Sequence, residues 1–338
     1  MAENEYNLKF EQLCQHLQLG DLVGTPERLT GGLLHRIYEV KTTLGKYAIK
    51  ALNPEVMQRP QAINNFRNAE DIAQIAAKHV PAEPAKQFHG SSLQLLDQQY
   101  YLVFDWVEGR SLKLNEVNLT HSERMGSILA EIHKTDFSEL GLVKVEHSRA
   151  HPIDWNSLLR QGIQYETAWV QLLHDNIERL YDWDSWANAS ANLLELNNVI
   201  SHLDLDAKNV LWNEDGPILI DWEASGYIHP MRSLTETALY WSETELGTIE
   251  RDRFIAFVRG YKNGIGAIQG DWRSVLESGY SGMLGWLAYN LKRSLPIGSN
   301  DEQEQQVGTE QVIGTIDALV RYADRIDEIE QWLIEESR

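Results

Sequence analysis

The sequence contains a single cysteine in 338 residues, Cys14, and this scarcity excludes two kinds of stabilisation. One thiol has no partner for a disulfide within the chain, and it is too few for a zinc site built mainly from cysteine ligands. A chain of this length buries a large core without such cross-links. We therefore expect a protein that folds in a reducing compartment, the cytoplasm.

Long apolar runs are also missing, and so is a basic start followed by an apolar segment. No apolar stretch approaches the roughly 18 residues that a membrane helix needs. The N-terminal segment MAENEYNLKF does not have the form of a secretion signal. We therefore expect a protein that neither spans a membrane nor is exported.

Basic residues are few relative to acidic ones. Thirty Lys and Arg residues against fifty Asp and Glu residues give a formal net charge of −20. Such a charge repels nucleic acid phosphates and anionic lipid head groups, so we expect neither nucleic acid nor a membrane as a partner. The excess of acidic residues either serves solubility alone or also attracts a cationic substrate by its electrostatic field. The sequence leaves both interpretations open.

The remaining composition is that of a globular protein, with 43% hydrophobic and 24% charged residues. The length suits two lobes that share a cleft better than one compact domain. An apolar, aromatic strand at 99–107 runs into Glu108-Gly109, which marks the predicted boundary. We expect an N-terminal nucleotide-binding lobe at 1–107 and a C-terminal catalytic and substrate-binding lobe at 108–338.

The two predicted lobes differ in their periodicity. The first lobe shows a short helix within 7–18, β-forming residues at 29–50 with a hairpin turn at Leu44-Gly45-Lys46, and a helix over 62–79, which indicates a small antiparallel sheet. The second lobe shows mainly helical periodicity, including a helix opened by a capping box of Thr120 and Glu123. Within the second lobe, the stretch 201–223 alone has the pattern of strands and loops.

This stretch, ISHLDLDAKNVLWNEDGPILIDWE from residue 200, holds the candidate chemistry. Two short apolar runs, 210–212 and 217–220, predict a hairpin that turns at Asp215-Gly216. The hairpin brings Asn209, before its first strand, next to Asp221, after its second. Magnesium prefers oxygen ligands of this kind, completed by phosphates and water. Asp204 then lies at the same end of the hairpin with a carboxylate that can orient a hydroxyl and accept its proton.

The order H-x-D-x(4)-N, followed by an apolar residue and Asp, is that of the kinase catalytic loop and metal-binding Asp. HLDLDAKNVLW with ILIDWE resembles the aminoglycoside phosphotransferase and choline kinase superfamily. The resemblance implies an α+β class and a bilobal protein-kinase-like fold. It implies that Asp204 is the catalytic aspartate, that Asn209 and Asp221 bind the metal, and that His202 is the histidine of the loop, which we expect to hold the loop in place. Leu203 stands where the family commonly has glycine.

The resemblance also implies a nucleotide site in the first lobe. Lys50, in YAIK, matches the strand lysine that contacts the α- and β-phosphates. Gly31-Gly32 lies some twenty residues ahead of it, as a loop that covers the phosphates does. Glu70 follows on a predicted helix at a distance suited to pairing with Lys50, and its neighbour Asp71 is the alternative partner.

The segment that joins the predicted lobes resembles the purine-binding segment of the family. The backbone groups of Asp105 and Val107 are the ones that would hydrogen-bond the base. The cofactors implied are Mg²⁺ and ATP, with GTP as an alternative donor.

These features predict a small-molecule kinase that transfers a γ-phosphate to a hydroxyl, with an aminoglycoside-like molecule as the favoured acceptor. A metabolic kinase of the choline, methylthioribose or homoserine type is an alternative, and a catalytically silent nucleotide-binding pseudokinase is another. The sequence does not indicate an oligomeric state.

Candidate acceptor contacts are acidic or aromatic. Four glutamates are candidates for binding protonated amines, although each of them can equally face water: Glu223, Glu236, Glu243 and Glu245. Trp241, Trp286 and Tyr289 form either an aromatic cage for a quaternary ammonium group or part of the core.

Overall fold

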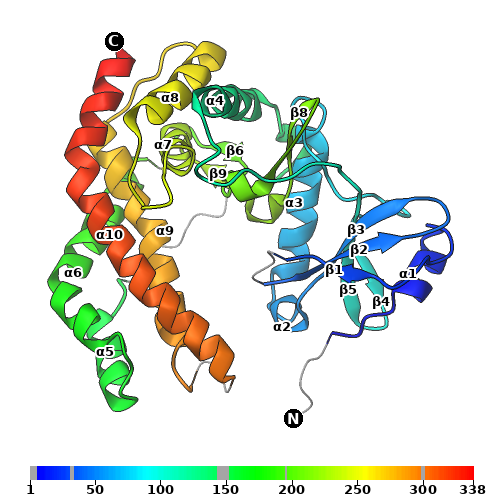
Figure 1. Cartoon of the computed structure of the whole chain (residues 1–338). Helices are drawn as coiled ribbons and strands as arrows, with labels where there is room; N and C mark the ends of the chain where they lie inside the picture. The colour runs from blue at the N-terminus through cyan, green and yellow to red at the C-terminus, as the bar shows by residue number, and fades with distance from the viewer. Residues whose placement is uncertain (1–5, 31–33, 143–151, 195, 298–300) are drawn as a thin grey trace. The chain divides into compact units, whose positions relative to one another are not determined.

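The structure, a computed structural model, describes residues 6–30, 34–142, 152–194, 196–297 and 301–338. It divides into two compact units. Unit 1 comprises residues 1–117, 131–143 and 200–226, and unit 2 comprises residues 118–130, 144–199 and 227–338. The segment with the candidate chemistry thus folds with the N-terminal part of the chain. The predicted mixed class, with a small antiparallel sheet and a larger helical part, is confirmed (Figure 1).

Unit 1 is built around a five-stranded sheet in the order β1-β2-β3-β5-β4, and every neighbouring pair is antiparallel. Its first elements are α1 (Phe10–His16), β1 (Glu27–Arg28), β2 (Arg36–Lys41), β3 (Lys46–Ala51), α2 (Pro54–Met57), α3 (Ala62–Ala76), β4 (Gln94–Leu96) and β5 (Gln99–Asp105). Its later ones are η1 (Ser138–Leu140), η2 (Ala207–Asn209), β7 (Val210–Asn213), β8 (Gly216–Leu219) and η3 (Trp222–Ala224). The strands β6 (Val199–Ser201) and β9 (Gly226–Ile228) lie at the boundaries between the units.

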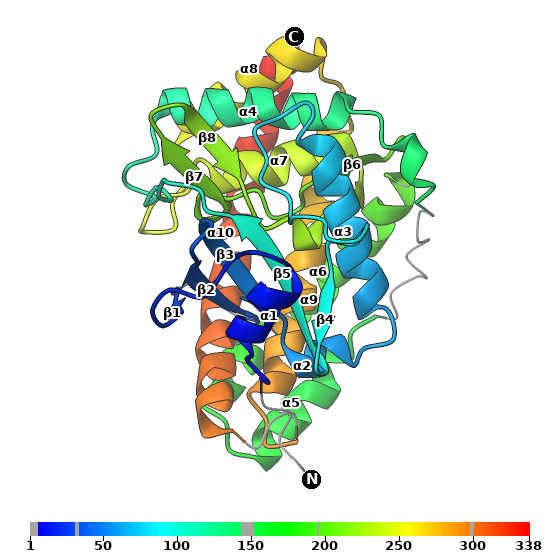
Figure 2. The same cartoon turned by 90° about the vertical axis from the view of Figure 1, so that its right-hand side faces the viewer.

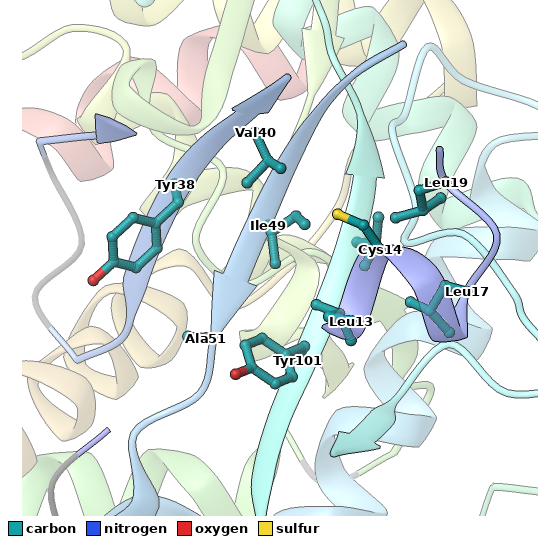
Figure 3. Close-up of a cluster of buried hydrophobic side chains, with 10 residues drawn as sticks. Leu13, Cys14, Leu17, Leu19, Tyr38, Val40, Ile49, Ala51 and Tyr101 are labelled. Atoms are coloured by element: carbon teal, nitrogen blue, oxygen red, sulfur yellow. The ribbon is translucent and has the colours of Figure 1, made fainter. Parts of the chain in front are cut away.

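One face of the sheet packs against α1. Tyr38, Ile49 and Val103 follow one another across β2, β3 and β5 in register, and they share a buried core with Leu13 and Cys14 of the helix. Figure 2 shows α1 lying across the strands, and Figure 3 shows the side chains of this core. The short predicted helix within 7–18 therefore serves as the cover of one sheet face.

The opposite face of the sheet carries Lys50. In register, Lys50 lies between Ile37 and Leu102, and Leu102 packs in a second core with Phe66 of α3. Successive side chains of a strand point to opposite faces. The alternation that buries Ile49 against α1 therefore places Lys50 on the face that α3 covers.

Unit 2 is helical in the residues that the structure describes. Its helices are α5 (Trp155–Gln164), α6 (Val170–Leu193), α7 (Pro230–Tyr240), α8 (Arg251–Ile265), α9 (Trp272–Arg293) and α10 (Glu302–Ser337), and α4 (Leu119–Lys134) begins in unit 2 and ends in unit 1. Close approach of α4 and α8 requires glycine. A Cβ atom on Gly126 would lie 2.0 Å from the Phe257 carbonyl oxygen, and one on Gly260 would lie 2.0 Å from that of Glu123. No helix in the described part of the chain is long and apolar enough to span a membrane.

The cap of α4 differs from the predicted one. Asn118, rather than Thr120, precedes the helix: its Oδ1 accepts from the backbone N–H of His121 at 3.0 Å, and its own N–H donates to His121 Nδ1 at 3.3 Å. The reciprocal bonding of a capping box is present, but two residues earlier than predicted. An asparagine is as good an N-cap as a threonine, so the two positions compete in the sequence.

Candidate functional site

The predicted hairpin of unit 1 is present, but its turn is formed by Glu214-Asp215, one residue earlier than predicted, because Gly216 already pairs with Asn213. β7 and β8 are antiparallel, with Asn213 opposite Gly216, and Asn213 Oδ1 accepts from the N–H groups of Asp215 and Gly216 at 2.9 and 3.1 Å. Gly216 has φ +122°, a conformation that glycine adopts without strain. At the open end, Ile220 N–H donates to Asn209 O at 3.0 Å. Asn209 therefore lies beside the residue that precedes Asp221.

His202 organises the loop before the hairpin. Its side chain is fully buried, Nε2 donates to the carbonyl oxygen of Ile220 at 3.0 Å, and Nδ1 faces the backbone N–H of Asp204 at 3.4 Å. The ring also lies against Trp222, with centroids 4.6 Å apart. Burial lowers the pKa of His202 to about 4, so the imidazole is neutral at physiological pH. His202 links the loop to the far strand of the hairpin, which is a holding role.

Asn209 holds the carboxylate of Asp204. The Asn209 Nδ2 group donates to both the backbone oxygen and Oδ2 of Asp204, each at 2.8 Å. The other carboxylate oxygen, Oδ1, faces Lys208 Nζ at 3.4 Å, and Lys208 binds Asp206 more closely, at 2.7 Å. Burial raises the pKa of Asp204, although Lys208 opposes the shift. One oxygen of Asp204 is thus fixed while the other is only loosely engaged.

Two residues of the site adopt left-handed backbone conformations. Leu203 has φ +64°, and Asp221 has φ +64° and ψ +61°. Such conformations cost residues with a Cβ atom roughly 1–3 kcal/mol and cluster at functional sites. The position of Leu203 is therefore one where glycine is the unstrained residue.

Lys50 bridges two carboxylates of the segment after β8. Its ammonium lies 2.7 Å from Asp221 Oδ1 and 3.0 Å from Glu223 Oε2, and the lysine side chain is 6% exposed. Burial would lower the pKa of Lys50, but Asp221 and Glu223 raise it above its ordinary value. Burial alone would raise the pKa of Asp221, yet Lys50 holds it below the usual range. For Glu223 burial outweighs Lys50, and its pKa is raised. Lys50 is charged, and it binds Asp221 in its ionised form.

His35 adds a buried neutral group to this cluster. Its Nδ1 accepts from the backbone N–H of Asn53 at 2.9 Å, so the proton of the neutral ring resides on Nε2, which lies 3.7 Å from Glu223 Oε2. Burial, reinforced by Lys50, lowers the pKa of His35 to about 4. The ring packs edge-on against Phe66 of α3. His35 therefore presents an N–H toward Glu223.

The predicted pairing of Lys50 with Glu70 is not made in the structure. Glu70 is 4% exposed, and its Oε2 accepts from the backbone N–H of Ala85 at 2.7 Å. Burial raises the pKa of Glu70 to about 7, although the bond from Ala85 opposes the shift. The two carboxylates after β8 lie closer to the ammonium, and Glu70 is tied to the loop that precedes β4. The alternative partner, Asp71, is exposed.

Residues 25–275 match the model of a family described as the phosphotransferase enzyme family. The chain belongs to this family. The predicted resemblance is thereby confirmed, and the protein is a phosphotransferase enzyme. No curated protein matches the chain.

Solved structures that this phosphotransferase resembles share its fold at low sequence identity. Spectinomycin phosphotransferase APH(9)-Ia, solved with ADP and spectinomycin, has a TM-score of 0.68 and 15% identity, over 92% of this chain and 98% of that one. Plasmodium vivax ethanolamine kinase has a TM-score of 0.57 and 14% identity, over 87% and 81%. Choline kinase from Cryptosporidium parvum Iowa II has a TM-score of 0.57 and 13% identity, over 96% and 99%. These similarities confirm the predicted kinase-like fold.

The other nucleotide-binding candidates of the phosphotransferase fall partly outside the described residues. Gly31 and Gly32 lie outside them. The carboxylate of Asp105 accepts from Lys86 Nζ at 2.8 and 2.7 Å, so its side chain is engaged. In the described part of the chain no hydrogen bond uses the backbone N–H of Val107, which leaves that donor for a ligand. Purine binding by Asp105 and Val107 stays a prediction.

The acidic candidates for acceptor binding have diverse surroundings. Glu223 binds Lys50, as described above. Glu236 accepts from Arg232 Nε at 2.7 Å. Burial raises the pKa of Glu243, although Arg321 opposes the shift.

The aromatic candidates separate into core and surface. Trp241 is fully buried and belongs to the core. Trp286 and Tyr289 stand on α9, 37% and 39% exposed, and their rings stack with centroids 5.5 Å apart and an interplanar angle of 22°. The core interpretation holds for Trp241, and the exposed pair retains a face for a ligand.

Sequence reasoning did not identify His35 as part of the site, and it assigned Glu223 to the acceptor. The sequence ILIDWE contains a feature that could have indicated the role of Glu223, because this second acidic residue follows Asp221 by two positions. The signal for His35 was weaker. Its position before β2 and opposite Asn53 emerges only when β2 and β3 are paired.

Proposed function

We propose that this phosphotransferase moves the γ-phosphate of a nucleoside triphosphate to a hydroxyl group of a small molecule, with Asp204 at the acceptor hydroxyl. The supporting observation is the arrangement of unit 1, in which Asn209 fixes one oxygen of Asp204 while Lys50 fixes Asp221. Phosphoryl transfer depends on positioning and charge stabilisation more than on covalent chemistry of the protein, and this arrangement suits that requirement.

Asp204 accepts the proton of the attacking hydroxyl in this proposal. Its Oδ2 is held by Asn209, so the loosely engaged Oδ1 is the atom that would receive the acceptor O–H. The raised pKa of Asp204 brings the carboxylate closer to the pH at which a general base works best. Lys208, whose side chain is 61% exposed, would either move aside or meet a phosphate oxygen.

The donor set fits magnesium. The amide nitrogen of Asn209 is used on Asp204, so its amide oxygen is the atom left for a metal, and Asp221 keeps Oδ2 while Oδ1 accepts from Lys50. Among the described residues no group of three or more His, Cys, Asp or Glu could hold a metal, which suits an ion that takes most of its ligands from phosphates and water. Asn209 and Asp221 would hold Mg²⁺, which neutralises phosphate charge when bound.

Lys50 would contact the phosphates of the nucleotide. It is buried and charged, and it lies on the same sheet face as the segment that carries Asp221. A triphosphate that enters competes with Asp221 and Glu223 for its ammonium. Spectinomycin phosphotransferase was solved with ADP, and we extend nucleotide binding to this chain on that likeness. ATP is the proposed donor, with GTP as the alternative.

The acceptor is proposed to be a cationic small molecule of the aminoglycoside type. The net charge of −20 favours a cation by long-range attraction. A second candidate is a choline-type metabolic kinase, because the stacked and exposed pair of Trp286 and Tyr289 offers the aromatic face that a quaternary ammonium group prefers.

The test is a panel of acceptors with ATP and with GTP, in which ADP or GDP release is measured. Aminoglycosides and spectinomycin represent the first candidate, and choline and ethanolamine the second. On an acceptor that is turned over, Asp204→Asn should lower kcat by about 10²–10⁴-fold and leave ATP affinity by calorimetry unchanged. Asp215→Asn, in the exposed turn of the hairpin, is the matched control and should keep full activity.

Unchanged turnover in Asp204→Asn would refute the assignment of the base. Rapid choline turnover without aminoglycoside turnover would make the second candidate the function. Binding of Mg·ATP by the native chain without turnover of any acceptor in the panel would instead indicate the catalytically silent, nucleotide-binding pseudokinase.

A further inference from the structure

Lys208 lies beside the proposed base, in a loop that fixes its backbone on both sides. Asp206 Oδ1 accepts from the backbone N–H of Lys208 at 2.9 Å, and Ser111 Oγ donates to its carbonyl oxygen at 2.8 Å. Both chain neighbours, Ala207 and Asn209, are 4% exposed, whereas the side chain of Lys208 is 61% exposed. The position of the ammonium therefore depends only on rotation within a flexible four-carbon side chain.

The ammonium of Lys208 lies between two carboxylates. Its Nζ lies 2.7 Å from Asp206 Oδ2 and 3.4 Å from Asp204 Oδ1. The shorter distance is that of a charge-assisted hydrogen bond, so Asp206 is the main partner. Asp206 thus holds Lys208 twice, by the backbone through Oδ1 and by the ammonium through Oδ2. This double contact keeps Nζ near Oδ1 of Asp204, whose other oxygen is bound by Asn209.

The position of Nζ suits a contact with the group that is transferred. In the proposed reaction the acceptor oxygen lies within about 2.6–3.2 Å of Asp204 Oδ1. The γ-phosphorus lies about 3–3.5 Å beyond that oxygen, so it lies within roughly 6 Å of Oδ1. Nζ is already 3.4 Å from Oδ1, and one hydrogen bond of about 2.8 Å covers the remaining distance. Lys208 therefore reaches the phosphoryl group without a change in the backbone.

The charge balance of the site favours a cation at this place. Among the residues that the structure describes, the site has four carboxyl groups against two ammonium groups: Asp204, Asp206, Asp221 and Glu223 against Lys50 and Lys208. Lys50 is buried and shared by the two carboxylates after β8. A γ-phosphoryl group that approaches Asp204 meets a like charge, which disfavours the approach. Lys208, the exposed one of the two, offsets this repulsion on the side of the attack.

We propose that Lys208 contacts the γ-phosphoryl group during transfer and that Asp206 positions Lys208 for this contact. The inference rests on the proposed function, because it requires a nucleoside triphosphate at this site. A bond forms from the acceptor oxygen to the γ-phosphorus, and the bond from that phosphorus to the β,γ-bridging oxygen breaks. Its electron pair leaves with the nucleoside diphosphate, and the acceptor proton goes to Asp204 Oδ1. Lys208 moves from Oδ1 to a phosphoryl oxygen and exchanges no proton.

The first test measures nucleotide affinity by calorimetry and needs no acceptor. The full chain is titrated with AMP-PNP, which carries a γ-phosphoryl group, and with ADP, which does not, both with Mg²⁺. Lys208→Met should weaken AMP-PNP binding by about tenfold, the effect of one hydrogen bond to a charged group, and ADP binding by less than twofold. Lys208→Arg keeps the charge and should stay within about threefold of the native chain for both nucleotides.

The matched control is Lys78→Met. Lys78 is another exposed lysine of unit 1, with 64% side-chain exposure and a carboxylate of Glu139 at 3.5 Å, and its loss should change neither affinity. Circular dichroism confirms that each variant is folded.

Asp206→Asn tests the positioning role separately. The asparagine still accepts from the backbone N–H of Lys208 but no longer attracts the ammonium. It should weaken AMP-PNP binding by about threefold in the native chain and cause no further loss in Lys208→Met, because the two changes act through one contact. With an acceptor that is turned over, Lys208→Met should also lower kcat by about 10²-fold while the KM of the acceptor stays within threefold.

Three results would overturn the proposal. The first is native affinity for AMP-PNP in Lys208→Met, and the second is equal weakening of AMP-PNP and ADP binding. The third is a higher kcat in Lys208→Met, which would show that Lys208 obstructs Asp204. Failure of the proposed function has a different signature: turnover survives in Asp204→Asn, or no acceptor is phosphorylated, while the loss of AMP-PNP affinity in Lys208→Met is still measured.

Discussion

Replacement of Lys50 by methionine removes the ammonium that bridges two carboxylates and keeps a side chain of similar length. The loss of one partner from a buried ion pair costs about 3–5 kcal/mol. The side chains of Asp221 and Glu223 retain 30% and 27% exposure, so water compensates part of this loss. We therefore expect Lys50→Met to destabilise the nucleotide-free protein by about 2–3 kcal/mol, which corresponds to a fall in Tm of about 3–4 °C at an unfolding entropy of about 2.1 cal/mol/K per residue.

The pH dependence of the stability lost in Lys50→Met tests whether the cause of the loss is electrostatic. Without Lys50, the folded-state pKa of Asp221 rises above its unfolded value and the pKa of Glu223, already raised, rises further, because the ammonium no longer opposes the effect of burial. A carboxyl group whose pKa is raised on folding stabilises the protein at low pH and loses that contribution as pH rises through the folded pKa. The deficit of Lys50→Met relative to the native protein should therefore be larger at pH 8 than at pH 5.

The matched control is Lys86→Met, which breaks the pair with Asp105 at the end of the same sheet. That pair is more exposed, at 32% and 57%, and exposed pairs contribute little to stability. Thermal unfolding of both variants is measured by circular dichroism at pH 5 and pH 8 in the absence of nucleotide and Mg²⁺. Equal losses in the two variants, or a Lys50→Met deficit that is independent of pH, would refute the electrostatic account.

Three further predictions concern the backbone, the helix packing and a buried imidazole, each read by thermal or urea unfolding. Leu203→Gly should have a free energy of unfolding about 1 kcal/mol higher than Leu203→Ala, because φ is positive at this position. At Leu211 in β7 the order of the two variants should be reversed. Higher stability of the alanine variant at both positions would contradict this explanation. Gly260→Ala should destabilise by more than about 2 kcal/mol because α4 contacts α8 there, whereas Gly282→Ala on the open face of α9 should be neutral or stabilising; similar effects would contradict the close packing. Burial lowers the pKa of His133 to about 3. As pH decreases below about 6.5, the unfolded chain therefore binds a proton that the folded chain does not, and the free energy of unfolding decreases. His133→Gln should reduce that slope by about 1.4 kcal/mol per pH unit, and an unchanged slope would show that His133 does not carry it.

The parts of the site that depend on local sequence were predictable. The hairpin of β7 and β8 has a short turn between two apolar runs, and its register alone brings Asn209 beside the strand end that leads to Asp221. His202 and Asp204 follow by their spacing from Asn209. The start of helix α10 was less predictable: its apolar residues recur at helical spacing only from Val312 onward, whereas the helix begins after its N-cap Asp301 in a polar segment without an apolar period.

The parts that depend on distant contacts were not predictable. Glu70 has a helical position compatible with Lys50, but whether it turns to the lysine or to Ala85 is decided by the path of the loop before β4. Lys50 likewise forms its ion pairs with Asp221 and Glu223, which lie more than 170 residues further along the chain. Spacing along the chain limits the possible partners of a buried charge, and tertiary packing chooses among them.

The core beneath α1 gives the protein a reporter of its own local opening. Cys14 is fully buried between the helix and the sheet face opposite Lys50, and burial raises the pKa of its thiol to about 11. A thiol reagent can react with it only after α1 leaves the sheet, because reaction requires both access and the thiolate. With no second cysteine to complicate the signal, the labelling rate measures the free energy of undocking α1 in the otherwise native enzyme.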